Sequence, residues 1–307
     1  MGAGWSSIHP LPAFLYYAAL LGLSMLLLHP IYLLTAVAWT LWLWNMTDKK
    51  GISPKKIGYY VLTGAVIAMA NPLFTHRGAT ILFYMLDQPV TLESVVYGFL
   101  MMLSLLAILF AFQSYQLVMT GEKTMVLFAR MAPRTTLVIR MAMRFVPLLL
   151  RRFKQVYDVQ RTQGMSQGRR SLRRKARDGM QLVSILLTWS LEEAIISARS
   201  MRARGYGLHR RTNYTRYRMR RGDWILLIAI AVTVGVILIG KYVGYATFET
   251  YPRLGTIAFA DYEWAVYFAY CSFLLIPLYL EGKEWYSWRW WRSTNSPLPT
   301  PMPRGRR

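Results

Sequence analysis

The sequence predicts an all-α, polytopic membrane protein with about six transmembrane helices and one basic cytoplasmic region of long amphipathic helices. Three observations lead to this prediction. The 307 residues are 54% hydrophobic, with a mean hydropathy of +0.25, a composition outside the soluble globular class. Several apolar segments reach the roughly 20 residues that a helix needs to cross the hydrocarbon core. Most of the net charge of +23 lies in residues 118–222, which contain 24 basic and 5 acidic side chains.

Four spans are predicted before the basic region. Leu11 to Trp44 contains no charged side chain, and His29-Pro30 divides it into two helices, because proline ends or kinks a helix. The first of these helices is predicted to be retained, because no basic n-region precedes it. The third and fourth spans are Ile57–Phe74 and Val95–Met119. Between them, Ala79–Leu86 is apolar but too short to cross, which indicates a re-entrant or interfacial piece.

Two further spans are predicted at Trp224–Phe248 and Tyr262–Leu280. Cytoplasmic loops carry an excess of Lys and Arg, so the loop charges give the orientation. With the N-terminus inside, the inside segments 45–56, 118–222 and 281–307 have net charges of +3, +19 and +4, whereas the outside loops 75–94 and 247–261 have −1 each. Both termini are therefore predicted to be cytoplasmic. The predicted domains are 1–117 with four spans, the basic region 118–222, the hairpin 223–280 and a basic, Trp- and Pro-rich tail 281–307.

The first half of the basic region has a helical period from Thr136 to Gln163. Its polar stripe alternates spacings of four and three and consists of Arg140, Arg144, Pro147, Arg151, Lys154, Asp158 and Arg161. The opposing stripe consists of Ala142, Val146, Leu149, Phe153 and Val156. This pattern predicts a long amphipathic helix that is kinked near Pro147.

A second helix is predicted from Arg169 to Arg204, with an apolar run at Leu182–Ile196. That run has only 15 residues and includes two glutamates, so we expect it to pack on a partner helix or lie against the membrane. Ala194 and Ala198 are four residues apart, which gives the helix a narrow face for close packing.

Both helices end in a similar sequence. Arg161-Thr162-Gln163-Gly164-Met165 closes the first, and Arg202-Ala203-Arg204-Gly205-Tyr206 closes the second, 41 residues later. One interpretation is structural, because glycine suits the left-handed position after a helix and arginine suits the negative end of its dipole. The other is functional: each end would present a cation and an apolar residue that dock into a groove of a partner. Two such ends would match two partner copies.

Two other functions account for parts of the pattern. A basic membrane scaffold that binds nucleic acid or anionic lipid would use the charge of 118–222, but that charge follows amphipathic helices and carries no RNA- or DNA-binding signature. A membrane-embedded enzyme would need acidic or histidine side chains that converge within the spans, and none do. Cys271 is the single cysteine, and the four histidines lack the spacing of a ligand cluster. No catalytic residue, metal site or cofactor is therefore predicted in this chain.

Several motifs resemble the transmembrane T component of energy-coupling factor (ECF) transporters, which are ABC-type importers of vitamins and metal ions related to cobalt permeases. The resemblance extends from the early apolar region to about Gly207. Its most specific stretch runs from Glu192 to Gly207 and contains Ala203-Arg204-Gly205. The other motifs are Asn71-Pro72-Leu73, Gly78-Ala79-Thr80, Thr91-Leu92-Glu93 and Arg144-Phe145-Val146-Pro147-Leu148.

This resemblance implies a non-catalytic coupling subunit in the plasma membrane of a prokaryote. Its two coupling helices would each insert one end into one of two ATP-binding-cassette ATPase subunits, which hold ATP and magnesium, and it would also bind a small substrate-binding S component. Arg204 matches the family's second docking motif. The first motif departs from the family, since Gln163 stands where arginine is expected, and Arg161 lies two residues earlier. A permease of another ABC importer remains an alternative, although it would need only one short coupling helix.

Overall fold

The structure is a computed structural model, and it describes residues 8–48, 51, 53–75, 78–85, 88–129, 131–162, 172–208, 219–248, 250, 255 and 262–294. It divides into two compact units. The first unit comprises Met1–Thr124 and Arg218–Arg307, and the second comprises Met125–Tyr217.

The first unit is built from six long helices and one small hairpin. The helices are α1 (Pro10–Leu26), α2 (Pro30–Thr47), α3 (Pro54–Phe74), α4 (Leu92–Val118), α8 (Arg221–Val243) and α9 (Glu263–Thr294), and the strands are β1 (Ile81–Met85) and β2 (Gln88–Thr91). The helices α1, α2 and α3 each begin on proline. Proline suits this position because its missing N–H would have no partner there and its fixed φ is already helical. A short helix, α5 (Gly121–Ala129), follows α4 at the division between the units.

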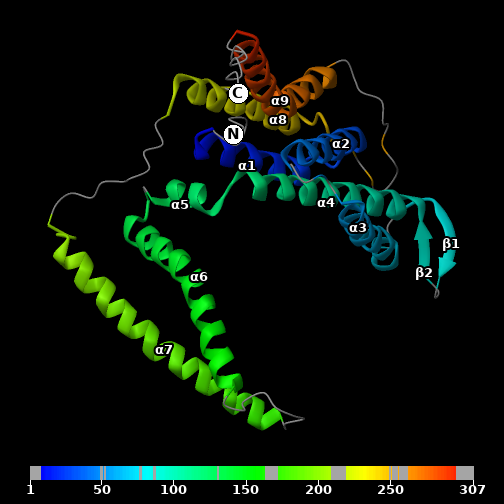
Figure 1. Cartoon of the computed structure of the whole chain (residues 1–307). Helices are drawn as coiled ribbons and strands as arrows, with labels where there is room; N and C mark the ends of the chain where they lie inside the picture. Colours follow the sequence, from blue (N-terminus) through cyan, green and yellow to red (C-terminus); the bar gives the residue numbers. More distant parts are fainter. Residues whose placement is uncertain are drawn as a thin grey trace, which may run out of the picture. The chain divides into compact units, whose positions relative to one another are not determined.

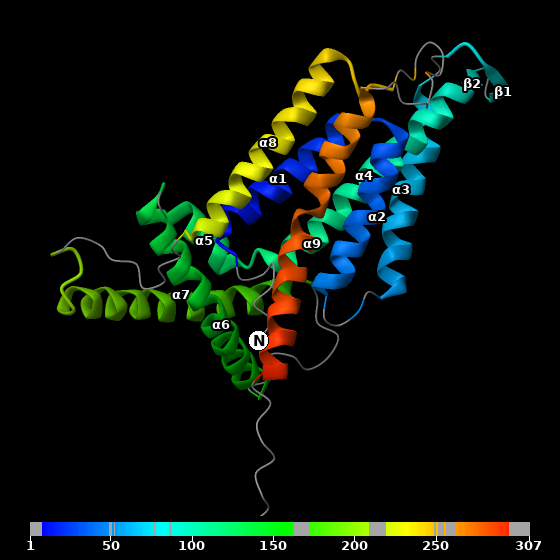
Figure 2. The ribbon, with the colours of Figure 1, turned by 90° about the horizontal axis from the view of Figure 1, so that it is seen from above.

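The helices of the first unit form three layers. Helices α1 and α2 make the middle layer, with α3 and α4 on one side and α8 and α9 on the other (Figures 1 and 2). The middle position explains why apolar side chains of α1 and α2, such as Tyr16, Leu20 and Ala36, are fully buried. The described core therefore depends on packing between segments that lie far apart in the sequence.

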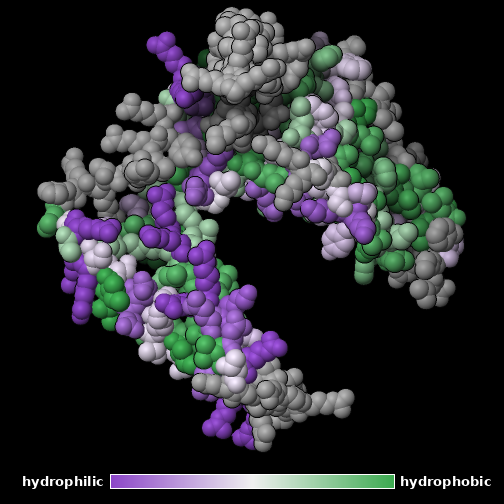
Figure 3. All heavy atoms as spheres, in the orientation of Figure 1, coloured by the Kyte–Doolittle hydropathy of each residue, from purple (hydrophilic) through white to green (hydrophobic). Residues whose placement is uncertain are grey.

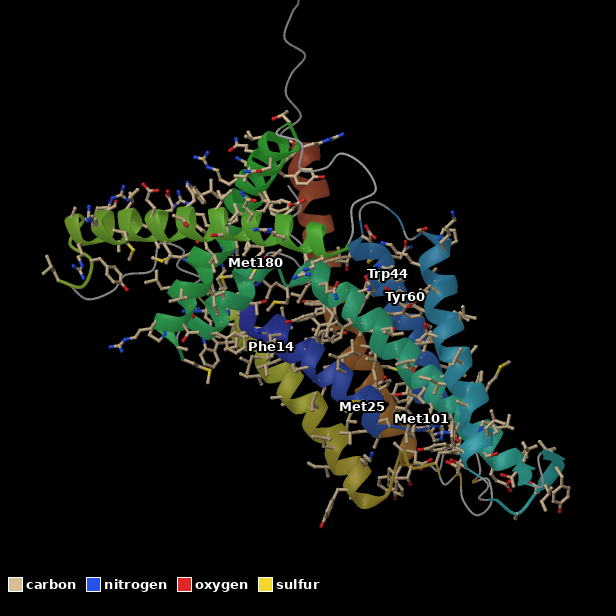
Figure 4. The ribbon with its side chains drawn as sticks, turned by 90° about the horizontal axis from the view of Figure 1, so that it is seen from below. Phe14, Met25, Trp44, Tyr60, Met101 and Met180 are labelled. Carbon is tan, nitrogen blue, oxygen red and sulfur yellow. The ribbon has the colours of Figure 1, made fainter. Side chains whose placement is uncertain are left out.

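Two aromatic clusters join the layers. On one side, Tyr16 of α1 stacks on Phe273 of α9 with ring centroids 4.9 Å apart. On the other side, Trp44 of α2 lies against Tyr60 of α3 at 6.1 Å and against Phe110 of α4 at 5.8 Å (Figure 4). Such aromatic pairs contribute about 0.5–1.5 kcal/mol each beyond the area that they bury.

Buried polar side chains add links between helices. The hydroxyl groups of Tyr17 in α1 and Ser114 in α4 are 2.7 Å apart, and the Ser104 hydroxyl donates to the Ser24 carbonyl at 2.8 Å. Interhelical hydrogen bonds of this kind contribute about 0.6–2 kcal/mol in a membrane. They fix α4 against the middle layer.

Glycines permit the closest helix contacts. A Cβ at Gly98 of α4 would lie 2.7 Å from the Ala68 carbonyl oxygen of α3, and one at Gly240 of α8 would lie 2.6 Å from a Val266 methyl group of α9. A Cβ at Gly64 of α3 would lie 3.0 Å from the Met102 side chain. Small residues at membrane helix interfaces let the backbones approach in this way.

The predicted all-α membrane architecture is confirmed. Among the described residues, five helical segments are long and apolar enough to cross a membrane by length and composition: Pro54–Phe74, Leu92–Val118, Ala176–Ala203, Arg221–Val243 and Glu263–Leu280. The first two predicted spans are α1 and α2, whose 17 and 18 residues lie at the short end of what can cross. The third of the five segments was predicted to lie in the cytoplasm and belongs to the second unit.

Three local features differ from what the sequence predicts. Most of the apolar piece at 79–86 forms β1, which pairs antiparallel with β2. Helix α8 ends at Val243 instead of 248, because Gly244 adopts a left-handed φ of +102°. Helix α9 continues past Leu280 to Thr294, so the backbone of the Trp-rich segment at 285–293 is helical.

Candidate functional site

The first amphipathic helix of the second unit is α6 (Pro133–Thr162). It begins on proline and continues through Pro147, which is exposed, and its ribbon bends along its length (Figure 1). At its end, the Thr162 hydroxyl donates to the Val159 carbonyl at 2.6 Å, and the Arg161 side chain is exposed. Gln163 and Gly164, the remaining residues of the first predicted docking motif, lie outside the described residues.

The second amphipathic helix, α7 (Leu172–Ala203), ends in a well-defined turn. The Tyr206 N–H donates to the Met201 carbonyl at 3.0 Å, and the Gly205 N–H donates to the Arg202 carbonyl at 2.9 Å. These are the two hydrogen bonds of a Schellman motif. Gly205 has a φ of +77°, a left-handed conformation that costs other residues about 1–2 kcal/mol. The turn therefore requires glycine at the position where the sequence places it.

The Schellman turn presents Arg204 at the tip of α7. Its N–H donates to the Ser200 carbonyl at 3.1 Å, so the backbone is fixed, while the side chains of Ala203 and Arg204 are exposed. Arg202, two residues before Arg204, is exposed as well. A guanidinium in this position can make two parallel hydrogen bonds to a carboxylate of a partner.

The two helices meet at Trp189. Its indole ring stacks on Phe145 of α6, with centroids 5.8 Å apart and an interplanar angle of 17°. The guanidinium carbon of Arg152, also on α6, lies 5.1 Å from the centroid of the Trp189 ring. Phe145 and Arg152 are seven residues, or about two helical turns, apart. Trp189 is thus held by two side chains of α6, and we call these three residues the Trp189 clamp.

The Trp189 clamp was not predicted from the sequence pattern. The candidates for helix packing, Ala194, Ala198 and Pro147, are all exposed in the structure, and the aromatic contact between α7 and α6 lies at Trp189, five residues before Ala194. A signal for it was available, because Trp189 is the single tryptophan of residues 118–222 and lies within the apolar run Leu182–Ile196.

The pair of α6 and α7 leaves much apolar surface uncovered. Figure 3 shows hydrophobic and hydrophilic side chains interspersed over the second unit. Apolar side chains that are more than half exposed include Val138, Val146, Leu150, Met180, Leu187 and Leu191. Exposed apolar surface of this extent is typical of an interaction site. The ends of α6 and α7 lie well apart in both ribbon views (Figures 1 and 2), so the pair offers two separate points of contact.

The exposed groups at the ends of α6 and α7 suit contact with a partner. Among the described residues, no three or more His, Cys, Asp and Glu side chains lie close enough together to hold a metal ion. The exposed groups at the helix ends are guanidinium, methyl and hydroxyl groups. Groups of this kind can make hydrogen bonds and apolar contacts with a partner.

Comparison with known proteins gives the family. The model of the CbiQ cobalt transport protein family matches residues 6–214. The energy-coupling factor transporter transmembrane protein EcfT of Lacticaseibacillus paracasei is 32% identical over 104 residues, which are 34% of this chain and 39% of that relative. The aligned part thus spans less than half of the relative. Since the family match covers more than half of the chain and agrees with the motifs in the sequence, the chain belongs to the CbiQ cobalt transport protein family, the family of ECF transporter T components.

Proposed function

We propose that this chain is the coupling subunit of an ECF-type ABC importer in a prokaryotic plasma membrane. It relays the ATP-driven closure of two ATPase subunits to a small substrate-binding S component, for the uptake of a vitamin or a metal ion. The chain itself is non-catalytic, and ATP and magnesium bind to the partner ATPases. Membership of the CbiQ family and the similarity to EcfT support this proposal.

The observation that carries the proposal is the presentation of Arg204. Two backbone hydrogen bonds and a left-handed glycine fix the turn, yet the arginine side chain projects from it exposed. A fixed backbone lowers the entropy that is lost on docking. An acidic groove on an ATPase subunit would make charge-assisted, bidentate hydrogen bonds to this guanidinium.

The first docking point is the end of α6, where Arg161 supplies the exposed cation. Its helix ends away from the tip of α7 (Figure 2), which suits two ATPase subunits that each receive one helix end. The Trp189 clamp joins α6 and α7 between these ends. A displacement of one end is therefore passed to the other helix.

The orientation follows from charge. The basic region, the N-terminus and the C-terminus lie on the cytoplasmic side, where the ATPases have access to ATP and where anionic lipid headgroups attract the excess of Lys and Arg.

The test compares Arg204→Ala with Arg204→Lys and with Arg199→Ala, a control that removes another exposed arginine of α7. Each variant is expressed together with its ATPase and S-component partners, purified by a tag on this chain, and reconstituted for uptake. Removing one partner of a desolvated charge pair costs about 2–5 kcal/mol, so Arg204→Ala should weaken ATPase binding by about 30-fold or more. Lysine should restore binding only in part, because it cannot reproduce the planar fork.

Membrane insertion of all variants should remain normal, which fluorescence size-exclusion chromatography would check. Uptake and ATPase retention at the wild-type level in Arg204→Ala would refute the docking role of this residue. An equal loss in Arg199→Ala would assign the effect to general charge instead.

A further inference from the structure

The hairpin of β1 and β2 is fixed at its base by a buried carboxylate. Glu93, in the first turn of α4, is 2% exposed. Its Oε1 accepts hydrogen bonds from the N–H groups of Ala79 and Thr80, both at 3.2 Å, and from the Thr80 hydroxyl at 2.8 Å. The Leu92 N–H donates to the Thr80 carbonyl at 3.0 Å. The start of the hairpin is therefore tied to the start of α4.

Gly78 makes this contact possible. A Cβ at this position would lie 2.5 Å from Oε2 of Glu93 and 2.7 Å from the Thr91 hydroxyl. Thr91 also caps α4, since its hydroxyl accepts from the Ser94 N–H at 3.3 Å. Glu93 acts as a positioning residue, which holds the hairpin at one angle to the helix.

The outer strand carries apolar side chains that the described fold leaves uncovered. Ile81, Leu82 and Tyr84 are 50%, 53% and 69% exposed, whereas Val90 of the inner strand is 4% exposed. Leu82 and Tyr84 are two residues apart and therefore lie on the same face of β1, whereas a register shift between Ile81 and Phe83 interrupts the regular alternation there. Residues 78–86 include no charged side chain. A flexible aqueous loop would be expected to be more polar.

The hairpin also lies across the end of α4 instead of continuing along it, as the ribbon shows in two perpendicular views (Figures 1 and 2). Membrane helices are tilted by only about 20° on average from the bilayer normal. A hairpin that lies across the end of α4 therefore runs close to the membrane plane, at the level where α3 and α4 leave the hydrocarbon core.

The apolar surface of the hairpin continues that of α3. In the last turn of α3, Leu73 and Phe74 are 47% and 84% exposed, and they lie five and four residues before Gly78. Hydrophobic surface covers this end of the first unit in the space-filling view (Figure 3). Since α3 is a span, this surface faces lipid.

The backbone of β1 determines how deep in the membrane the hairpin can lie. In the described sheet, β1 pairs on one side only, with β2, so its other edge has polar groups that hydrocarbon could not satisfy at a cost of several kcal/mol each. Headgroups and interfacial water can satisfy them, and the interface is where tyrosine is enriched in membrane proteins. We propose that the hairpin lies flat in the headgroup region as a membrane-surface anchor, with Leu82 and Tyr84 directed to lipid, and that Glu93 sets its angle.

The experiment measures the depth of single nitroxide labels in the full chain, reconstituted in liposomes. Cys271→Ala removes the single cysteine, and labels are then attached to Leu82→Cys or Tyr84→Cys. Val232→Cys on α8, 58% exposed within a span, gives the lipid reference, and the exposed Glu192→Cys gives the polar reference. Collisions with oxygen report lipid, and collisions with a water-soluble nickel chelate report water.

Labels at both hairpin positions should collide with the nickel chelate several-fold less often than the label at 192. They should still collide with oxygen, although less often than the label at 232. Nickel collisions as frequent as at 192 would refute the anchor, because the hairpin would then lie in water. Protection from both reagents would also refute it and would indicate a protein partner, such as a strand added to β1. Glu93→Gln should increase the mobility of the label at 84, while Glu122→Gln, an exposed control, should not. Equal mobility in both would refute the positioning role of Glu93.

Discussion

Loss of the Trp189 clamp should loosen the crossing of α6 and α7. Trp189→Leu keeps an apolar side chain but removes both contacts with α6. The stack on Phe145 is worth about 0.5–1.5 kcal/mol, and the cation–π contact with Arg152 is worth about 0.5–1 kcal/mol at a partly exposed site. The expected loss is therefore about 1–2.5 kcal/mol, which raises the population of other crossing geometries about 5- to 70-fold.

The length of α7 amplifies this loss. Fifteen residues separate Trp189 from Arg204, so the arm from the clamp to the docking tip is about 22 Å long, and a 10° change at the clamp moves the tip by about 4 Å. Functional groups must usually stay within about 0.5 Å of their productive positions. A loose crossing should thus impair coupling even though Arg204 itself is unchanged.

The assay is a distance measurement by pulsed electron paramagnetic resonance on the full chain in liposomes. Nitroxide labels are attached to Val159→Cys and Ile196→Cys, which are 56% and 53% exposed, in a Cys271→Ala background. The distance distribution should broaden in Trp189→Leu. In the reconstituted transporter, uptake per ATP hydrolysed should fall while ATPase binding persists.

Leu191→Ala is the matched control, because Leu191 lies on the same helix and is 64% exposed. It should leave the distance distribution unchanged. If Trp189→Leu gave the same narrow distribution as the wild type, the clamp would not hold the crossing. A double-mutant cycle with Arg152→Met would then be expected to show no coupling energy, whereas the structure implies about 0.5–1 kcal/mol.

Three further predictions concern stability and the docking turn. The Nδ1 of His9 accepts a hydrogen bond from the Leu11 N–H at 3.2 Å, and burial lowers the pKa of this histidine. The unfolded chain therefore binds more protons than the folded chain near pH 6. The free energy of unfolding should decrease as the pH is lowered below about 6.5. His9→Asn, an acceptor that does not titrate, should flatten this slope in thermal unfolding between pH 5 and 8, and equal slopes would contradict the assignment. Gly98→Ala should lower the free energy of unfolding by about 1–3 kcal/mol, because its Cβ meets the α3 backbone. Gly64→Ala should lower it less, because its Cβ meets a flexible side chain that can move. The melting temperatures of the two variants in detergent test this difference. Gly205→Ala should weaken ATPase co-purification about 5- to 30-fold, because alanine is strained by about 1–2 kcal/mol in the left-handed conformation. Gly205→Asn should bind the ATPases better than Gly205→Ala does. Binding by the alanine variant at the wild-type level would argue against the role of the turn.

The spans in α3, α4, α8 and α9 were predictable because length and apolar composition determine them, but the same criteria also select Ala176–Ala203, which was predicted not to cross. Helix starts were predictable as well, since proline at Pro30 marked the start of α2. The turn at Gly205 has the geometry that a glycine after the last helical residue predicts. In each case the information lies within a few neighbouring residues.

The hairpin could not be derived in the same way. A run of eight apolar residues fits a strand, a helix turn or an interfacial piece equally well. The strand at Ile81–Met85 depends on hydrogen bonds from Ala79 and Thr80 to Glu93, which is 14 and 13 residues away from them. No local pattern encodes that pairing.

The position of the Trp189 clamp could not be predicted from a local sequence pattern either. Periodicity gave the polar and apolar stripes of α6 and α7, but it says nothing of how far one helix is shifted along the other. The alanines at 194 and 198 suggested one crossing point, while the aromatic contact lies at Trp189 with Phe145. Large aromatic side chains favour the site where they bury the most area.

The middle position of α1 and α2 has a consequence for synthesis in the cell. Their packing partners α8 and α9 are far along the chain, since the Tyr16 hydroxyl donates to the Leu274 carbonyl, 258 residues away. At about 5–20 residues per second, one face of the first two helices stays without its final neighbours for about 10–40 s after they are made. Membrane insertion of the nascent chain therefore precedes completion of the bundle, and a chain that stops before α8 leaves that face of Tyr16 and Tyr32 open to lipid.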